Sequence, residues 1–327
     1  MLLISHDCTD PAWNLALDEY LLTHFTEEVL SLWRNGPSVI VGRNQNALEE
    51  IDQDFVRARG IAVVRRLTGG GAVFHDLGNV NYTLVQPYQE GDFNNYAKFT
   101  RPIVDFLAEL GVRAELSGRN DLLVEGRKCS GNAQAVRGGR ILHHGTLLFS
   151  ADLSQLAGAL RPRDIKIQSK GVKSVSSRVT NLAAHLPAPM AVEEFLDRLR
   201  AYFLKTVPDL TPYALTEADR TAVDTLREEK YGTWEWNFGS APRYTWSRAM
   251  KFPFGLVDAR LDVDRGVIRS AALYGDYFGQ LDSAGLAQRL VGLPHRREAL
   301  LPVLQALPLG DYIAGSTIEE LLQLLCP

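Results

Sequence analysis

Residues 65–84 read RRLTGGGAVFHDLGNVNYTL, and the organisation of the surrounding chain follows from this stretch. Two runs of β-branched and apolar residues, 61–66 and 80–85, lie on either side of three consecutive glycines, which predicts two strands flanking a bare loop. Residues without a Cβ let backbone N–H groups approach a ligand closely, and the neighbouring Arg65 and Arg66 favour an anionic ligand. A tight turn with both arginines in solvent is the alternative that this stretch alone leaves open.

The glycine loop matches neither of the common phosphate-binding fingerprints. A P-loop requires a Lys-Ser or Lys-Thr pair after its glycines, and no such pair follows here. The dinucleotide-binding motif requires a glycine at the position that Phe74 occupies. An anion site built on this loop therefore belongs to another class.

Composition sets broad limits on the protein. The chain has 327 residues, 46% hydrophobic and 23% charged, which is ordinary for a soluble protein and long enough for two domains. A net charge of -4 gives no overall signature of nucleic-acid binding. The three cysteines are widely separated and lack metal-ligand spacing, which favours a reducing compartment and argues against structural zinc. Because the N-terminus lacks a leader pattern and no apolar run reaches about 18 residues, we expect a cytoplasmic protein without a membrane span.

The first 240 residues mix strand and helix patterns without strict alternation. Asp10 and Pro11 predict the start of a helix that runs through 13–25. Further patterns predict strands at 29–34 and 38–43, a hairpin of 121–134 with 141–149, and helices at 99–111, 192–207 and 216–232. This mixture predicts a mixed sheet in an α/β or α+β fold rather than a doubly wound sheet.

A smaller C-terminal domain is predicted beyond an aromatic segment with Gly and Pro at 233–244. We place the boundary so that the domains are residues 1–240 and 241–327. The smaller domain has patterns for a hairpin of 255–263 with 266–273 and for helices near 284–292, 297–306 and 317–325. Ser316 and Glu319 are expected to cap the last helix. A small α+β domain is the resulting prediction.

Polar side chains gather in two further segments. The predicted hairpin contributes Asp121, Lys128, Ser130, Asn132, His143, His144 and Thr146. Since successive strand residues face opposite sides, one member of each adjacent pair can face a site while the other packs elsewhere. The second segment, 166–182, is rich in lysine and favours a mobile basic loop that closes over phosphates. With Arg66 and the glycine loop, this set suits nucleotidyl transfer to a carboxylate, a step in which Lys128 neutralises charge and no protein nucleophile is needed.

Four segments occur in the order in which one enzyme family carries them. They are RRLTGGGAVFHDLGN, GRNDLLVEGRKCSGNAQ, HHGTLLF and KSVSSRVTNL. Through these motifs, most of the first 185 residues closely resemble the lipoate protein ligases. The later segments RYTWSRAMKFPFG and LYGDYFG resemble the small accessory domain of that family.

The resemblance implies a fold, substrates and partners. The large domain would be similar to the catalytic domain of biotin protein ligases. The substrates would be lipoic acid and ATP with Mg²⁺, and lipoyl-AMP would pass its lipoyl group to a lysine of a lipoyl domain. The acceptors would be E2 subunits of 2-oxoacid dehydrogenases or the H protein of glycine cleavage. A monomer is expected, with no nucleic-acid partner, no membrane partner and no resident metal ion.

The same resemblance assigns site residues by their match to the family motifs. Lys128 matches the lysine of the KxSG motif, which contacts the lipoyl carbonyl and the phosphate, and is expected to be the catalytic residue. The loop that holds lipoate and nucleotide is matched by Arg66, Gly71, Ala72, Val73 and Phe74, with Gly69 and Gly70 giving it room. The remaining matches to cavity positions are His75, Asn79, Asp121 and His144. An apolar slot for the acyl tail has Trp33, Val41 and Val73 as candidates.

Other interpretations stay open at this point. Lys128 could lie in solvent, and His75 and His144 could be core histidines satisfied by backbone partners. Acyltransferases of the same fold use a cysteine nucleophile and no ATP, but Cys129 occupies the variable position of KxSG, where strand alternation turns it away from Lys128. A catalytically silent relative could bind lipoate or a carrier domain without turnover. The presence of Arg66 and Lys128 favours the ligase over both.

Overall fold

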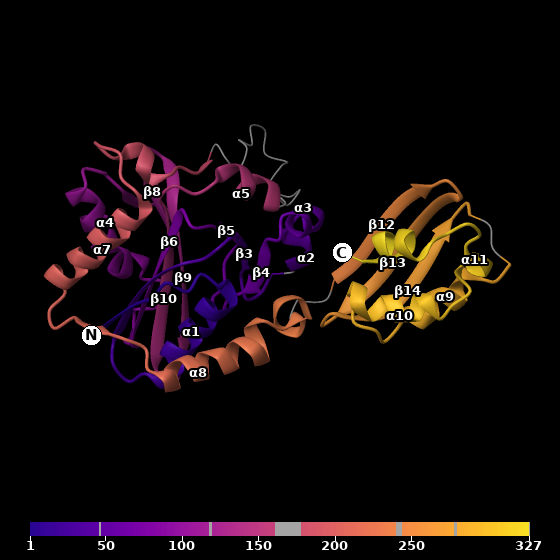
Figure 1. The fold of residues 1–327 in the computed structure, drawn as a ribbon, viewed down its shortest axis with the longest axis horizontal. Helices are drawn as coiled ribbons and strands as arrows, with labels where there is room; N and C mark the ends of the chain where they lie inside the picture. Colours follow the sequence, from indigo (N-terminus) through magenta and orange to yellow (C-terminus); the bar gives the residue numbers. More distant parts are fainter. Residues whose placement is uncertain (46, 118–119, 161–177, 240–243, 278–279, 327) are drawn as a thin grey trace. The chain divides into compact units, whose positions relative to one another are not determined.

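The computed structural model describes residues 1–327 except 46, 118–119, 161–177, 240–243, 278–279 and 327 (Figure 1). Contacts divide the chain into two compact units. One unit comprises Met1–Gln45 with Glu49–Thr233, and the other comprises Asn46–Leu48 with Trp234–Pro327. A separate cluster of buried hydrophobic side chains forms the core of each unit.

The larger unit is built on a mixed sheet. In spatial order, its described strands are β11 (Thr211–Tyr213), β1 (Leu2–Ser5), β2 (Val29–Arg34), β6 (Asn79–Pro87), β10 (Arg140–Leu148), β9 (Arg127–Arg137), β8 (Asp121–Val124) and β7 (Glu115–Ser117). Strand β1 pairs in parallel with β11 and β2, whereas the neighbours from β2 to β7 pair antiparallel. The predicted mixed sheet is therefore confirmed.

The helices of this part of the chain begin where the sequence places capping residues. Asp10 accepts hydrogen bonds from the backbone N–H groups of Ala12 and Trp13, and Thr216 forms the predicted capping box with Asp219. The described helices up to residue 231 are α1 (Pro11–His24), α2 (Ala47–Glu50), α3 (Gln53–Ala58), α4 (Tyr96–Glu109), α5 (Leu153–Ala159), η2 (Leu182–His185), α7 (Val192–Thr206), α8 (Glu217–Leu226) and η3 (Arg227–Tyr231). No helix in the described part of the chain is both long and apolar enough to cross a membrane.

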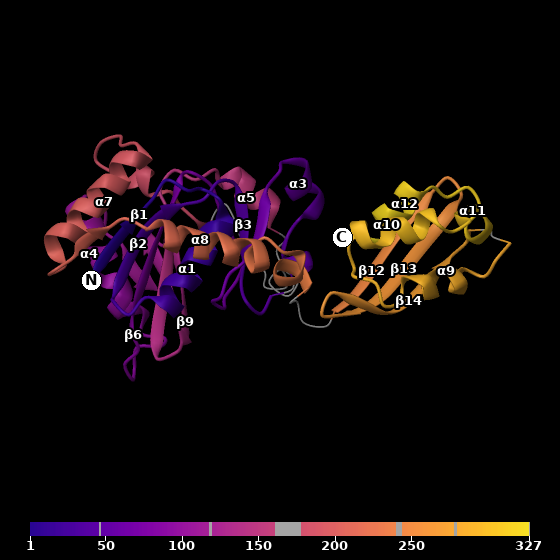
Figure 2. The ribbon, with the colours of Figure 1, turned by 60° about the horizontal axis from the view of Figure 1, so that its bottom comes forward.

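The large sheet has one apolar face and one polar face. Alternation along β2 and β6 turns side chains such as Leu32 and Tyr82 toward α4 and α7, with which they form the core. The same alternation turns Trp33 and Thr83 toward the opposite face. Figures 1 and 2 show α4 and α7 together on one side of this sheet and α1 on the other. The polar face is thus the one that α1 covers.

Helix α1 is anchored by a buried carboxylate. Glu19 accepts hydrogen bonds from Arg137 on β9 and from Lys230 and Tyr231 in η3. Burial alone would raise the pKa of Glu19, but the hydrogen bonds from Lys230, Tyr231 and Arg137 lower it below the ordinary value. Glu19 therefore stays ionised and links α1 to η3 and to the large sheet.

A second, three-stranded sheet carries the glycine loop. Strand β3 (Ser38–Val41) pairs in parallel with β4 (Ala62–Arg65) and antiparallel with β5 (Val73–His75), so the loop of residues 66–72 connects the two outer strands. The sequence predicted β3 and β4 but not β5, whose three residues lie inside the glycine-rich stretch. Strands β2 and β3 follow each other in the sequence but belong to different sheets.

The predicted hairpin of 121–134 with 141–149 is a three-stranded meander. Glu125 and Gly126 have φ values of 50° and 73°, and the turn that they form divides 121–134 between β8 and β9. Because glutamate rarely adopts this left-handed conformation, Gly126 was the one sequence signal for the turn. The predicted turn between β9 and β10 is confirmed, with Gly138 and Gly139 in the same conformation.

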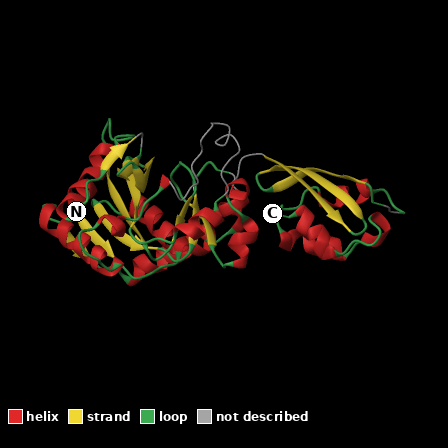
Figure 3. Ribbon diagram, turned by 90° about the horizontal axis from the view of Figure 1, so that it is seen from above, coloured by secondary structure: helices red, strands yellow, loops and turns green. Residues whose placement is uncertain are grey.

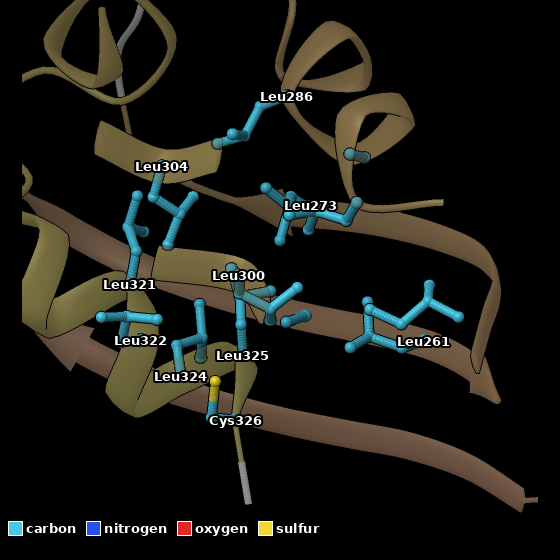
Figure 4. Close-up of a cluster of buried hydrophobic side chains, with 14 of the residues drawn as sticks. Leu261, Leu273, Leu286, Leu300, Leu304, Leu321, Leu322, Leu324, Leu325 and Cys326 are labelled. Atoms are coloured by element: carbon cyan, nitrogen blue, oxygen red, sulfur yellow. The ribbon is translucent and has the colours of Figure 1, made fainter. Parts of the chain in front are cut away.

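The smaller unit is an antiparallel sheet with helices against it (Figure 3). Its described elements are β12 (Tyr244–Phe252), β13 (Gly255–Asp264), β14 (Val267–Gly275), η4 (Glu235–Gly239), α9 (Ser283–Leu290), α10 (Arg297–Gln305), α11 (Leu309–Tyr312) and α12 (Ile318–Leu325). Leu300 and Leu304 of α10 and Leu321 of α12 point into its core (Figure 4). The predicted α+β character is confirmed, although the sequence did not predict β12 or α11.

The cap of α12 differs by one residue from the prediction. Thr317 is the N-cap, and its capping box uses Glu320 rather than Glu319. Ser316 instead donates a hydrogen bond to the carbonyl oxygen of Ile313. Two overlapping Ser/Thr-x-x-Glu patterns exist in the sequence, and the pattern alone does not choose between them.

The packing of α7 on the apolar face predicts that substitutions at two of its positions lower the free energy of unfolding by different amounts. Phe195 is fully buried, and its ring centroid lies 4.5 Å from Phe149 and 5.4 Å from Phe106. We expect Phe195→Ala to lower the free energy of unfolding by about 3–5 kcal/mol in urea denaturation. Leu204→Ala, at a position that is 40% exposed, should lower it by less than about 1 kcal/mol. Equal losses would contradict this placement of α7.

Candidate active site

A cleft lies between the polar face of the large sheet and the glycine loop. Its empty space is about 620 Å³, a volume that includes open solvent at the mouth of the cleft. Strands β2, β6, β9 and β10 contribute from the large sheet, and α1, β3 and the loop side of β5 contribute from the other side. The lining residues are Leu15, Trp33, Ile40, Arg66, Gly70, Gly71, Ala72, Val73, His75, Asn81, Asn120, Lys128, Gly131, Asn132, Ala133, His144, Gly145 and Thr146.

Most of the residues predicted for the site come together in this cleft. The predicted residues that line it are Arg66, Gly70, Gly71, Ala72, Val73, His75, Lys128 and His144. The others lie beside it: Gly69 accepts a hydrogen bond from Arg66, Asp121 pairs with Lys128, Asn79 donates to Asn81, and Phe74 is buried on the other face of β5. Trp33 and Val73 of the expected apolar slot line the cleft, whereas Val41 does not. The ligand contacts of these residues stay a prediction.

The Arg66 side chain is enclosed by neutral oxygen atoms of the loop that it belongs to. Its Nη2 donates to the carbonyl oxygens of Gly69 and Gly71 at 2.7 and 2.8 Å, and its Nε donates to Thr68 Oγ1 at 2.9 Å. Burial lowers the pKa of Arg66 to about 10, so the side chain is still cationic at neutral pH. In the described part of the chain no carboxylate pairs with it. A buried positive charge of this kind is complementary to an anionic ligand.

Arg65 has a structural role and does not share the position of Arg66 in the cleft wall. It is fully buried, and its Nη1 donates to the carbonyl oxygens of Gly42 and Gln45 at 2.9 and 2.7 Å. A Cβ at Gly42 would lie 2.0 Å from the carbonyl oxygen of Gly70, so only glycine permits this approach of the two loops. Arg65 therefore holds the backbone beneath the glycine loop, and it does not line the cleft.

His144 connects Arg66 to helix α1. Its Nδ1 lies 2.8 Å from Asp18 Oδ2, and its Nε2 lies 2.8 Å from Thr68 Oγ1. An ionised Asp18 carboxylate only accepts, so His144 Nδ1 carries a proton and donates to it, while Nε2 faces the Thr68 hydroxyl, which accepts from Arg66 Nε. Asp18 also accepts from Thr83 on β6. The chain of contacts fixes the orientation of His144 and of the guanidinium.

The neighbouring histidine, His143, has a structural role. His143 faces the opposite side of β10, where its ring stacks on Phe99 with centroids 4.9 Å apart. Burial lowers the pKa of His143 to about 3, so it is neutral at physiological pH. Of this adjacent pair, His144 faces the cleft and His143 packs in the core, as strand alternation predicted.

Lys128 lies at the β8–β9 side of the cleft. Its Nζ is 2.7 Å from Asp121 Oδ1, and both side chains are about one third exposed, at 33% and 35%. A Cβ at Gly131 would lie 2.9 Å from Lys128 Nζ, so the glycine of the KxSG motif provides the space for the ammonium group. A solvent-accessible ion pair is weak, and a phosphate can therefore replace Asp121 as the partner of Lys128.

Cys129 is separated from the cleft by the sheet itself. It is fully buried in the core with Leu122 and Val124, and its Sγ donates to the carbonyl oxygen of Leu122. Burial raises the pKa of Cys129 to about 12, which keeps the thiol protonated at neutral pH. These properties are unfavourable for a nucleophile.

Several lining residues were missed at the level of the sequence. Strand alternation from the predicted Asn79 would have reached Asn81, which lines the cleft. Asp18, which contacts His144 but does not line the cleft, was one of two acidic residues in the helix segment 13–25, and Leu15 lies one turn before it on the same side of α1. Ile40 carried no signal beyond that of a buried strand residue.

Two expectations concern features beyond these side chains. The segment 166–182 falls mostly on residues 161–177, which lie outside the described residues. Among the residues that the structure describes, no group of three or more His, Cys, Asp and Glu side chains could hold a metal ion.

Family models match both parts of the chain. The model of the lipoyl protein ligase A/B catalytic domain matches residues 10–204, and that of the bacterial lipoate protein ligase C-terminus matches residues 241–325. The chain belongs to the lipoate–protein ligase family. It is accordingly a ligase, and the cleft lies within the part that the catalytic-domain model matches.

Individual members of this family are similar to the chain in sequence and in structure. The lipoate-protein ligase LplJ of Bacillus subtilis is 41% identical over 325 residues, which is 98% of each chain. A solved structure of a bipartite lipoate protein ligase comes from Thermoplasma acidophilum and is described together with its E2 lipoyl domain. It superposes on this chain with a TM-score of 0.65 at 32% sequence identity. The match covers 74% of this chain and 97% of the Thermoplasma chain. A lipoate-protein ligase A solved with bound ATP has a TM-score of 0.63 and 30% identity, covering 73% and 98%.

The contact between Gly131 and Lys128 makes a prediction for this ligase. A methyl group in Gly131→Ala must displace the lysine side chain, because its Nζ and Cε would lie within 2.9 and 3.0 Å. We expect kcat/KM for ATP-dependent lipoylation to fall by about tenfold or more while the melting temperature changes little. Gly310→Ala is the control, since no atom lies within 4 Å of the added methyl. Unchanged activity in Gly131→Ala would show that the lysine position is not critical.

Proposed function

We propose that the cleft activates lipoic acid with ATP to form lipoyl-AMP and then passes the lipoyl group to a lysine of a lipoyl domain. The observation that carries this proposal is the presence of Arg66 and Lys128, two cationic side chains from different sheets, on one cleft whose remaining wall is largely apolar. The cations suit a carboxylate and phosphates, and the apolar wall suits a medium-length acyl chain.

The acyl chain would lie along the apolar part of the cleft. Leu15, Trp33 and Ile40 are all nearly fully buried and line it together. Burial of an apolar tail against such side chains contributes about 25 cal/mol for each Å² removed from water. The acyl tail thereby supplies binding energy, and the cations orient the carboxylate.

Lys128 would act as an electrostatic catalyst in both half-reactions. In the first, a lipoate carboxylate oxygen attacks the α-phosphorus, the bond from this phosphorus to the bridging oxygen breaks, and pyrophosphate leaves. In the second, the amine of the acceptor lysine attacks the lipoyl carbonyl carbon, loses its proton, and AMP leaves. The Lys128 ammonium would neutralise charge on the carboxylate and the α-phosphate without forming a covalent bond.

Arg66 and the glycine loop would hold the anionic part of the substrates. The guanidinium is already fixed by Gly69, Gly71 and Thr68, so it loses little side-chain entropy when an anion binds. Mg²⁺ would enter with ATP, and Asp121 fits its preference for a few carboxylate oxygens completed by substrate phosphates and water. The ion would supply further neutralisation of phosphate charge.

The proposal extends to partners and cellular setting. E2 subunits or H protein are the proposed acceptors, which is supported by the study of the Thermoplasma ligase with its E2 lipoyl domain. We further propose a monomer that acts in the cytoplasm, with functional domains at 1–240 and 241–327. None of the three cysteines that the structure describes forms a disulfide, which accords with a reducing compartment.

Replacement of Lys128 tests the catalytic assignment. We expect Lys128→Ala to lower the rate of lipoate-dependent pyrophosphate release by about 10²–10³-fold, because it removes a preorganised charge from the reacting groups. Lys128→Arg retains the charge and should keep more activity than the alanine variant. Lipoyl-AMP formation at the normal rate in Lys128→Ala would refute the role. Lipoate binding without pyrophosphate release in the wild type would instead indicate a silent binding module.

The state of Cys129 separates the ligase from a cysteine-dependent acyltransferase. We expect Cys129→Ala to retain most of its ATP-dependent activity, because the thiol lies in the core and away from the cleft. In the native protein, iodoacetamide should modify the half-buried Cys8 before the fully buried Cys129, as mass spectrometry of peptides can measure. Acyl transfer from an octanoyl carrier that is lost in Cys129→Ala would support the acyltransferase.

A further inference from the structure

The backbone of Lys128 lies where two strands of the large sheet separate. The pairing of β9 with β10 starts at Asn132, which is opposite Gly145, whereas the pairing of β9 with β8 already starts at Arg127. Between Arg127 and Asn132, β9 therefore has β8 beside it but has left β10. A backbone group that loses its partner in the sheet needs another partner or water.

A β-bulge adds to the irregularity of β9 at this point. The β8–β9 pairing skips Cys129, because Lys128 and Ser130 are paired with consecutive residues of β8. Strict alternation from Gly131, which lines the cleft, would turn Lys128 to the other face, yet Lys128 lines the cleft as well. Bulges bend a strand and re-aim its side chains. The bulge at Cys129 thus aims Lys128 into the cleft, in a stretch where the sheet is interrupted.

Residues 179–182, which we call the 179–182 anchor, lie beside Lys128. Val179 forms a parallel bridge with Lys128, and the backbone N–H of Thr180 donates to the carbonyl oxygen of Lys128 at 2.8 Å. Thr180 is 3% exposed, so this bond is shielded from water. The anchor therefore supplies the Lys128 backbone with a neighbour in the stretch that β10 has left.

The side chains of the 179–182 anchor fix it to the sheet. Thr180 Oγ1 lies 2.9 Å from His185 Nε2. Asn181 makes two bonds to the backbone of Ala151, which follows β10: its Nδ2 donates to the carbonyl oxygen at 2.8 Å, and its Oδ1 accepts from the N–H at 3.1 Å. Leu182 is fully buried in the core of the larger unit. Through these contacts the anchor joins the end of β10 to the backbone of Lys128.

The ammonium group of Lys128 depends on its backbone for its position. Its described partner, Asp121, forms an ion pair that is about one third exposed and is therefore weak. In the proposed function the ammonium group must leave Asp121 for a carboxylate and a phosphate. Electrostatic catalysis requires placement within a fraction of an ångström, which a flexible side chain reaches only from a fixed backbone.

We propose that Thr180 and Asn181 are positioning residues, which fix the backbone of Lys128 and thereby the placement of its ammonium group during adenylation of the acid. The inference rests on the proposed function of the cleft. Neither residue is among those that line the cleft. Their loss should therefore slow the reaction of bound substrates and leave the binding of the acid nearly unchanged.

Substitution of Asn181 gives the first test. Lipoate-dependent pyrophosphate release would be measured at saturating ATP over a range of lipoate concentrations. We expect Asn181→Ala to lower kcat by about fivefold or more, because both bonds to Ala151 are lost and the anchor can shift. The KM for lipoate should change by less than about twofold, because the apolar wall of the cleft is untouched.

A matched pair at Thr180 gives a milder test. Thr180→Val keeps the shape of the side chain and its backbone N–H but removes the hydroxyl that contacts His185, and should lower kcat by about threefold or more. Thr180→Ser keeps the hydroxyl and should retain more of the rate. Thr206→Val is the control, since it removes an exposed hydroxyl that donates to the carbonyl oxygen of Tyr202 on α7, and kcat should not change.

The same substitutions in a Lys128→Ala background decide whether the effect passes through the lysine. A positioning residue has nothing left to position there, so Asn181→Ala and Thr180→Val should lower the residual rate by less than about twofold. If they lowered it by the same factor as in the wild type, the effect would be a general structural one and the proposal would be wrong.

The remaining outcomes are equally decisive. A wild-type kcat in both Asn181→Ala and Thr180→Val would overturn the proposal. If circular dichroism showed that Asn181→Ala does not fold, the Thr180 pair would decide. A normal rate in Lys128→Ala alone would refute the role of the lysine, and no release by the wild-type protein with ATP, Mg²⁺ and lipoate would refute the proposed function itself.

Discussion

A buried guanidinium that pairs with no carboxylate among the described residues is the constraint on which the cleft depends. Arg66 is tolerated in the interior because the carbonyl oxygens of Gly69 and Gly71 bend around it. A Cβ at Gly70, where φ is 96°, would lie 3.0 Å from its Nη2. The glycines thus accommodate the arginine as well as leaving room for a ligand. The positive charge of Arg66 makes the cleft complementary to an anionic ligand.

Much of the fold was accessible from the sequence because local signals agreed with the tertiary structure. The start of α1 at Asp10 and the capping box of α8 follow from single side chains that satisfy free N–H groups. The failures have equally local causes. Strand β5 has three residues and is held by pairing with β3, a contact that no nearby residue encodes. The turn at Glu125 required a left-handed glutamate, which sequence statistics disfavour.

The site was predictable to the extent that it is made of motifs. Arg66 was predicted because a cation beside a glycine loop suits an anion, and Lys128 and His144 were predicted because they match motif positions of the family. Asp18 and Asn81 were not, because their importance arises only when α1 covers the polar face of the sheet. Because successive strand residues face opposite sides, His144 and Lys128 line the cleft, whereas their neighbours His143 and Cys129 are buried on the other face of the sheet. The chemistry that the chain can perform is therefore decided by which side of the sheet a residue faces.

Helix α1 holds two consecutive carboxylates with different neighbours. Asp18 contacts His144 at the cleft, and Glu19 contacts η3 and β9. Because one rigid backbone joins them, α1 has a single position that satisfies both carboxylates at once. A change in charge at the cleft that repels or attracts Asp18 would act on η3 through the same helix. The helix therefore joins the His144 side of the cleft to η3 and β9, so that a displacement of α1 would alter both sets of contacts together.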